Sequence, residues 1–181
     1  KLWTEYRFKM LQQDFYGQYA VEMGLADGHM TELLANHFKR ITSVDASEQL
    51  VLHAKKALRL KNCEFVQSLF ETWRPQYKVD TVVMTHVVEH VKNPISLLNY
   101  VRTWITKRGR ILVMCPNANS LHRQIGVEMG ILPTITSLNE TDRMLGHQRV
   151  YTVNKLRQAV KRSGLRVQKE SGFFIKTFSN A

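Results

Sequence analysis

The chain has 181 residues, 44% of them hydrophobic and 23% charged, which is typical of one soluble globular domain and too short for two full ones. No apolar run approaches the roughly 18 residues of a membrane span, and no signal-peptide pattern opens the chain, so we expect a cytoplasmic protein without a membrane partner. The net charge of +11 would suit RNA, but the lysines and arginines are scattered and their longest runs are pairs, which favours a solvated basic surface.

Apolar, β-rich runs alternate with helical patterns over residues 18–116, which indicates βαβ units and an α/β fold with a parallel sheet. One helix is predicted between the first two strands, and a second begins after Ser47 and ends near Leu60. A third begins at Asn93 and Pro94, continues to Ile105 and is ended by Gly109. The five predicted strands are Tyr19–Met23, Ile41–Asp45, Glu64–Ser68, Asp80–Thr85 and Arg110–Cys115.

The pattern changes after Pro116, where residues 117–151 show only weak periodicity. A long stretch of this kind is usually a lid or binding segment, so we predict an insertion that covers the substrate. Order returns at Thr152, which can cap a helix that Gly164 ends, and Leu165–Phe178 offers one or two further strands. We therefore predict a single domain, 1–181, with a cofactor-binding core at 18–116, the insertion, and a C-terminal region at 152–181. Both cysteines, Cys63 and Cys115, are expected to be free thiols.

The loop after the first strand carries the main functional signal. Gly24 and Gly28 stand between that strand and the first helix, where glycine lets the backbone approach a ligand. Asp45 ends the second strand, where an acid can accept hydrogen bonds from both hydroxyls of a ribose. This set predicts a nucleoside-cofactor site, the alternative being a plain βαβ turn with a solvated Asp45.

The same loop indicates which cofactor is bound. A dinucleotide site has the spacing G-x-G-x-x-G, which is absent here, and a carboxylate at Glu22 would repel a pyrophosphate. Glu22 would suit a cofactor that carries a positive ammonium and sulfonium. We therefore expect S-adenosylmethionine.

Residues 18–116 resemble the class I S-adenosylmethionine-dependent methyltransferases, nearest to the ubiquinone-biosynthesis-like O-methyltransferase group. The first motif of that group is an acid, a hydrophobe and Gly-x-Gly-x-Gly, and residues 22–28 (EMGLADG) match it with Ala26 in place of the middle glycine. Residues 85–91 (THVVEHV) and 146–152 (GHQRVYT) resemble two further segments of these proteins. The resemblance implies a Rossmann-like, doubly wound, mostly parallel sheet of six to seven strands with helices on both faces.

With the resemblance, the predicted cofactor-binding residues are Glu22, Gly24, Leu25, Ala26, Gly28, Asp45, Ala46, Ser68, Leu69, Phe70 and Thr85. Of these, Ser68, Leu69 and Phe70 fall where the family contacts adenine.

His86-x-x-Glu89-His90 also spells the motif of inverted zinc peptidases. That mechanism needs both histidines on one helix face, whereas His86 directly follows a strand and a new helix starts three residues after His90, so we exclude it. We predict no metal site and expect Glu89 and His90 to cap or support the loop. A divalent ion held by Glu89 and His90 remains the alternative.

His86 is the first candidate for a general base, because it lies at the carboxyl end of the central strand, where open α/β sheets bind ligands. His147 is the second candidate, and a histidine that moves no proton is the alternative for either. The polar side chains near the insertion suggest substrate contacts from Asn117, His122, Arg123, Arg149 and Tyr151. Alternatively, Arg123 and Arg149 only tie the insertion to the rest of the chain.

The sequence thus predicts a methyltransferase that acts on an oxygen or nitrogen of a small polar or anionic molecule. The alternative is an RNA or protein methyltransferase, to which the charge would contribute, although nucleic acid is the less favoured partner. A noncatalytic binding module on the same fold is a third possibility. The sequence does not predict the oligomeric state.

Overall fold

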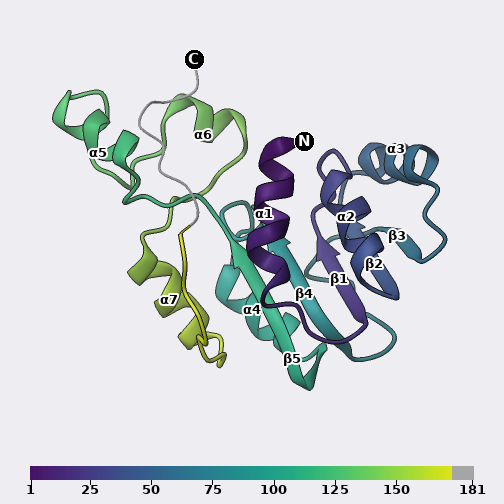
Figure 1. Cartoon of the computed structure of the whole chain (residues 1–181). Helices are drawn as coiled ribbons and strands as arrows, with labels where there is room; N and C mark the ends of the chain where they lie inside the picture. Colours follow the sequence, from purple (N-terminus) through teal and green to yellow (C-terminus); the bar gives the residue numbers. More distant parts are fainter. Residues whose placement is uncertain (173–181) are drawn as a thin grey trace. The chain divides into compact units, whose positions relative to one another are not determined.

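The computed structural model describes residues 1–172 and is drawn in Figure 1. The chain divides into two compact units. The first consists of residues 1–85 and 100–114, and the second of residues 86–99 together with the chain from Cys115 onward.

The first unit contains a sheet of five strands, all parallel, in the order β3-β2-β1-β4-β5. Its order matches the first five strands of the doubly wound Rossmann arrangement, and the predicted α/β class is confirmed. The strands are β1 (Tyr19–Met23), β2 (Arg40–Asp45), β3 (Cys63–Gln67), β4 (Val79–Thr85) and β5 (Ile105–Met114).

The prediction failed at the start of β5, where Ile105 was placed in a helix and Gly109 after it. Both residues lie in β5, which has an irregular register: Val79 pairs with Ile105, whereas Thr81 pairs with Arg110. The intervening residues bulge out of the ladder. A Cβ on Gly109 would lie 2.8 Å from the Ile105 Cβ, so the bulge requires glycine, and the residue was misread as a helix breaker.

The helices of the first unit are α1 (Leu2–Gln12), α2 (His29–His37), α3 (Glu48–Leu58) and the end of α4 (Pro94–Arg102). Ser47 caps α3 as predicted, its Oγ accepting the Leu50 N–H at 3.3 Å, and the Asn93 side chain caps α4 by accepting the Ser96 N–H at 3.0 Å. The sequence did not reveal α1, because Leu11 is its one buried residue and no apolar stripe forms.

The core of the first unit lies between helices α1 and α2 and one face of the sheet. Ala20, Ile41 and Val83 come from three strands and pack with Leu11 of α1 and with the apolar face of α2. Glu22 lies two positions after Ala20 in β1, so its side chain is on the same face of the sheet, beneath α2.

The second unit is mainly helical, with α5 (Leu121–Glu128), α6 (Glu140–Met144), α7 (Val153–Arg162) and the start of α4. The weak periodicity of residues 117–151 had suggested a stretch without regular elements, but this stretch contains helices α5 and α6. Asn139 and Asp142 form a capping box that begins α6, and Thr152 caps α7 as predicted.

Within residues 1–172 the sheet has five strands, not six to seven. The predicted strand region begins at Leu165, but residues 165–172 form no strand, and residues 173–178 of that prediction lie outside the described chain. After α7 the chain makes an ion pair back to that helix, with Glu170 Oε2 2.6 Å from Arg157 Nη2. Over the described range no helix is long and apolar enough to cross a membrane.

Candidate functional site

The loop between β1 and α2, residues 24–28, is called the glycine loop here. Gly24, Ala26 and Gly28 all have left-handed backbone conformations, with φ of 87°, 45° and 76°. The Gly24 N–H bonds to the Val44 carbonyl at 2.9 Å, and the Gly28 N–H bonds to the Leu25 carbonyl at 2.8 Å. Glycine adopts this backbone freely, whereas Ala26 does so at a cost.

Asp45 connects the glycine loop to the turn before α3. Its Oδ2 accepts the Leu25 N–H and its Oδ1 accepts the Ser47 N–H, both at 2.8 Å. Each oxygen keeps lone-pair capacity for a further donor, and the side chain is only half-buried. The Ser68 N–H bonds to the Asp45 carbonyl at 2.9 Å, so the structure brings the predicted ribose and adenine residues together at the ends of β2 and β3.

The remaining predicted residues near this edge are more open. Ala46 is exposed, and Leu69 is 58% exposed. Phe70 and Thr85 are half-buried, Thr85 being the last residue of β4. An exposed Leu69 at the carboxyl end of β3 offers an apolar surface of the kind that an adenine ring requires.

Glu22 lies fully buried within the first unit, beneath α2. Its Oε2 accepts hydrogen bonds from Thr31 Oγ1 at 2.6 Å and from Ser43 Oγ at 2.8 Å, while its Oε1 has no hydrogen-bond partner. Burial raises the pKa of Glu22 to about 7, and the two hydroxyl bonds only partly offset this. The sequence did not reveal Thr31 and Ser43 as partners, although Ser43 faces Glu22 in the strand register.

Gly28 was predicted to allow close approach of the backbone to a ligand. In the structure a Cβ at this position would lie 3.1 Å from Leu58 Cδ1 and 3.7 Å from the Ala54 Cβ. The close neighbour of Gly28 is therefore α3. Position 28 therefore requires glycine because its φ is left-handed and because a Cβ there would crowd Leu58.

In the second unit, residues 86–91 form a segment called the histidine turn here. His86 has a left-handed backbone, with φ of 57°, which is uncommon for a residue other than glycine. Its Nδ1 lies 3.0 Å from Glu89 Oε1, with the His86 side chain 35% exposed and the Glu89 side chain 1% exposed. A buried carboxylate thus orients a more accessible imidazole, as in catalytic dyads. From the sequence, Glu89 was expected to cap or support the loop or, alternatively, to hold a divalent ion with His90, and its contact with His86 was not predicted.

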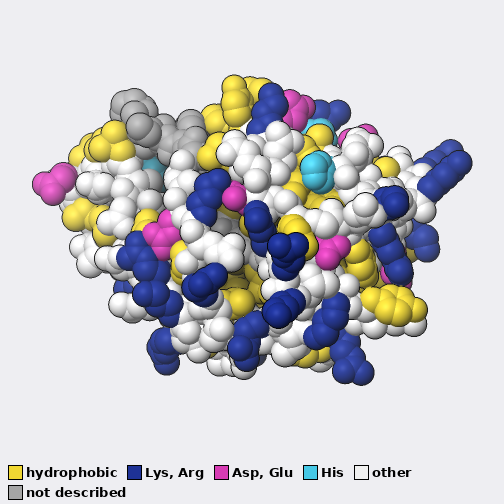
Figure 2. All heavy atoms as spheres, turned by 60° about the horizontal axis from the view of Figure 1, so that its bottom comes forward, with side chains coloured by type: hydrophobic (Ala, Val, Ile, Leu, Met, Phe, Trp, Pro, Cys, Tyr) yellow, Lys and Arg dark blue, Asp and Glu magenta, His cyan; other side chains and the backbone are white. Residues whose placement is uncertain are grey.

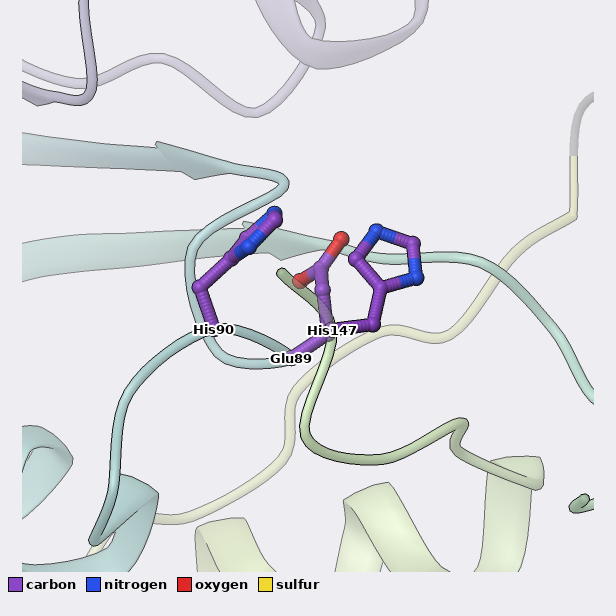
Figure 3. Close-up of side chains that lie close together, drawn as sticks. All are labelled: Glu89, His90 and His147. Atoms are coloured by element: carbon purple, nitrogen blue, oxygen red, sulfur yellow. The ribbon is translucent and has the colours of Figure 1, made fainter. Parts of the chain in front are cut away.

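His147, the second candidate base, is largely enclosed. Its side chain is 8% exposed, and its Nδ1 lies 3.1 Å from Asp142 Oδ1. Burial would raise the pKa of Asp142, but the bonds from the Asn139 N–H, Arg123 and His147 together lower it. The structure also brings His147 close to Glu89 and His90 (Figure 3).

The two predicted substrate arginines are occupied by contacts within the second unit. Arg123 is buried, pairs with Asp142 at 3.0 Å, and donates to the Ile135 and Ser137 carbonyls. Arg149 donates to the backbone carbonyls of Val88 and Val91 in the histidine turn and to that of Lys92, the next residue. These contacts favour the alternative in which both arginines hold the segment together.

The other three predicted substrate residues have different surroundings. Asn117 is exposed and pairs through its backbone with Tyr151, which is buried, and burial raises the pKa of the Tyr151 phenol. His122 is half-buried on α5. Both predicted free thiols are confirmed, and burial raises the pKa of Cys63 to about 11 and that of Cys115 to about 12.

Comparison with known proteins gives one family match, to a family described as a methyltransferase domain, over residues 2–170. A trans-aconitate 2-methyltransferase of Klebsiella pneumoniae is 26% identical over 121 residues, which cover 63% of this chain and 47% of that protein. A ubiquinone biosynthesis O-methyltransferase of Aeromonas salmonicida is 24% identical over 175 residues, covering 91% of this chain and 70% of that protein. The match to the first relative thus spans about half of its length.

Solved structures share the fold at low identity. A methyltransferase of Leishmania major has a TM-score of 0.72 at 15% identity, covering 93% of this chain and 63% of that one. An S-adenosylmethionine-dependent methyltransferase of Mesorhizobium loti has a TM-score of 0.70 at 15% identity, covering 88% and 80%.

Proposed function

Since this chain belongs to the methyltransferase domain family, we propose that it transfers a methyl group from S-adenosylmethionine to an oxygen or nitrogen of a small polar or anionic molecule. The family match and the fold confirm the sequence-based identification as a class I S-adenosylmethionine-dependent methyltransferase. The acceptor and its reacting atom belong to the proposal. Support comes from the two relatives, whose names specify trans-aconitate and an O-methylation.

The observation that carries the cofactor assignment is the arrangement around Asp45. Its carboxylate holds the glycine loop through the Leu25 N–H, and its own backbone carbonyl receives the Ser68 N–H. A ribose bound there would meet an acid that is already positioned by two backbone donors. The exposed Leu69, which follows Ser68 in the chain, would be available to the adenine.

His86 is proposed as the general base and Glu89 as the residue that orients it. Methyl transfer from a sulfonium is an in-line displacement, in which the protein positions the acceptor and removes its proton. The 3.0 Å contact between His86 Nδ1 and Glu89 Oε1 leaves the His86 Nε2 available for that proton. His147 is less suited to the role because its side chain is 8% exposed.

The distribution of positive charge on the surface bears on the class of acceptor. Figure 2 shows many Lys and Arg side chains, with uncharged side chains lying between them. An RNA acceptor would require a continuous basic surface with aromatic side chains for stacking. A small molecule has no such requirement, and it is the acceptor that we propose.

The test is calorimetry with S-adenosylhomocysteine on the wild-type protein and on Asp45→Asn. The wild type should bind one equivalent, and the substitution should weaken binding about 10-fold, because charge-assisted hydrogen bonds to ribose contribute roughly 1.5–3 kcal/mol. Asn retains an oxygen acceptor for the Leu25 N–H, so the loop should persist. Asp27→Asn, an exposed acid in the same loop, is the matched control. Equal affinity in wild type and Asp45→Asn would refute the ribose assignment.

Methylation itself is tested by incubating the protein with S-adenosylmethionine and a panel of small carboxylates, phenols and amines, followed by mass analysis. A product 14 mass units heavier, formed only with the intact protein, would establish the acceptor. Methylation of RNA but of no small molecule would overturn the proposed acceptor class while leaving the cofactor site intact.

A further inference from the structure

Three side chains of the second unit converge although they are far apart in the sequence. Glu89 and His90 belong to the histidine turn, and His147 follows α6. One potential metal-ligand atom from each lies within 4.8 Å of the other two. Figure 3 shows the Glu89 carboxylate between the two imidazole rings, whose centroids are 4.8 Å apart.

The Glu89 carboxylate has one oxygen that lacks a partner. Its Oε1 contacts His86 Nδ1, but its Oε2 is buried and has no hydrogen bond to any of residues 1–172. The Glu89 side chain is only 1% exposed. A buried, unpaired carboxylate oxygen is costly, and each example calls for an explanation. A cation held at Oε2 would remove the cost.

His147 is held in the manner of a metal-binding histidine. Its Nδ1 lies 3.1 Å from Asp142 Oδ1, and the other oxygen of that carboxylate is 3.0 Å from Arg123 Nη1. A proton on Nδ1 donates to Asp142, which leaves the Nε2 lone pair free. Figure 3 shows this second nitrogen facing the Glu89 carboxylate. A carboxylate behind a ligating imidazole is the usual arrangement, because it fixes the tautomer and the ring orientation.

His90 is the adaptable member of the cluster. Among the described residues no hydrogen bond to its ring nitrogens is found, and the side chain is half-buried. Its Nδ1 would lie 3.8 Å from a Cβ at position 146, where Gly146 has a left-handed φ of 75°. The imidazole can therefore rotate at little cost, whereas Glu89 and His147 are already fixed.

We propose that Glu89 Oε2, His90 and His147 Nε2 bind one divalent transition-metal ion of the Zn²⁺ type. Two imidazoles and one carboxylate are a common ligand set for zinc, whereas Mg²⁺ and Ca²⁺ prefer oxygen ligands. Ligand atoms of a tetrahedral zinc site lie about 3.3 Å apart, so the cluster must contract, chiefly by movement of His90. A site with three protein ligands keeps a position for a further oxygen or nitrogen ligand.

This proposal does not depend on methyl transfer, because metal binding is measured without cofactor or acceptor. Protein without a histidine tag, stripped by chelator, is titrated with Zn²⁺ in competition with a chromophoric chelator. We expect one equivalent to bind. Co²⁺ should give visible bands of nitrogen and oxygen coordination without thiolate charge transfer, because the proposed ligand set contains no cysteine.

Variants assign the ligands. His90→Ala removes a ring that makes no hydrogen bond within the described part of the chain, so this variant should fold and lose at least about 10-fold in Zn²⁺ affinity. Glu89→Gln and His147→Ala should lose as much or more. Asp142→Asn should weaken binding about 10- to 100-fold through His147. His53→Ala, at an exposed position on α3, is the matched control and should bind as the wild type does.

Two results would overturn the proposal. One is a wild-type protein that takes up no Zn²⁺ at roughly 100 µM, a concentration at which a site with three protein ligands should fill. The other is an unchanged affinity in His90→Ala, which would place the ion elsewhere. His90→Ala leaves the hydrogen bond between His86 and Glu89 and the one between His147 and Asp142 in place, so a loss of Zn²⁺ affinity in this variant reports the missing ligand rather than misfolding.

Discussion

The glycine loop of the first unit and the histidine turn of the second are stabilised in different ways. The glycine loop is held by its own backbone and by residues on adjacent strands, such as Asp45 and Val44. The histidine turn is held from far along the chain: Gln148 bonds to the Glu89 carbonyl at 2.9 Å, and Arg149 donates to carbonyls of the turn. The first kind of support follows from strand order, whereas the second requires long-range contacts.

This difference has a functional consequence. The glycine loop has left-handed backbone at Gly24, Ala26 and Gly28, so its proposed cofactor-binding function should be sensitive to backbone substitutions. The histidine turn presents side chains, so its function should be sensitive to their truncation. Substitutions that separate cofactor affinity from turnover therefore test whether the two regions have distinct roles.

The largest effect is expected at His86. His86→Ala should lower the methylation rate by about 10²–10⁴, the usual scale for loss of a general base, and should leave S-adenosylhomocysteine affinity within a few-fold. Steady-state kinetics with an identified acceptor and calorimetry measure the two quantities.

His86→Asn is the control for this experiment, because asparagine tolerates the left-handed backbone that His86 adopts. Both variants should be slow if the imidazole accepts the proton. A fully active His86→Ala would exclude the base role and direct attention to His147.

The second effect concerns stability and pH at Glu22. Its folded-state pKa of about 7 lies above the ordinary value of 4.5, so the folded protein binds the proton more tightly than the unfolded chain does. Stability therefore falls as the pH rises from about 4.5 to about 7 and is constant above that, the loss being about 3 kcal/mol. Glu22→Gln should remove this loss.

Urea unfolding at pH 5 and pH 8 measures the Glu22 contribution. Relative to wild type, Glu22→Gln should gain stability between the two pH values, whereas Glu71→Gln, at an exposed position, should not. Parallel pH profiles for wild type and Glu22→Gln would show that the Glu22 carboxylate is solvated or paired in solution.

The third effect tests the backbone of the glycine loop. Gly28→Val forces a β-branched residue into left-handed backbone and against Leu58, at a cost of roughly 2 kcal/mol. Cofactor affinity should fall about 10-fold or more by calorimetry. Gly130→Val, with φ of 70° and no atom within 4 Å of the new Cβ, carries similar backbone strain in the second unit and should leave that affinity unchanged.

The sequence predicted the sheet and the glycine loop because their signals are local. Strand alternation, the cap at Ser47 and the glycine spacing each depend on residues close together in the chain. It did not predict the pairing of His147 with Asp142, or the approach of His147 to Glu89, because these depend on how separate segments pack. The bulge in β5 was missed for a related reason, since Gly109 reads as a helix breaker unless the pairing of Val79 with Ile105 is known.

The smallest effect is expected at Ala26, where the chain departs from the glycine of the resembling motif. Ala26 has φ of 45°, and left-handed backbone costs an L-residue roughly 1–2 kcal/mol. Ala26→Gly removes that strain but increases the conformational entropy of the unfolded chain, which costs about 0.4–1 kcal/mol, so a net gain of up to about 1.5 kcal/mol in the free energy of unfolding is expected. The same substitution at exposed Ala57, in the last turn of α3, should instead destabilise by about 0.5–1 kcal/mol, because helical backbone favours alanine. Thermal unfolding of the two variants compares the signs directly. Opposite shifts in Tm would establish that Ala26 is strained in solution, and destabilisation by both would show that the loop relaxes around Ala26.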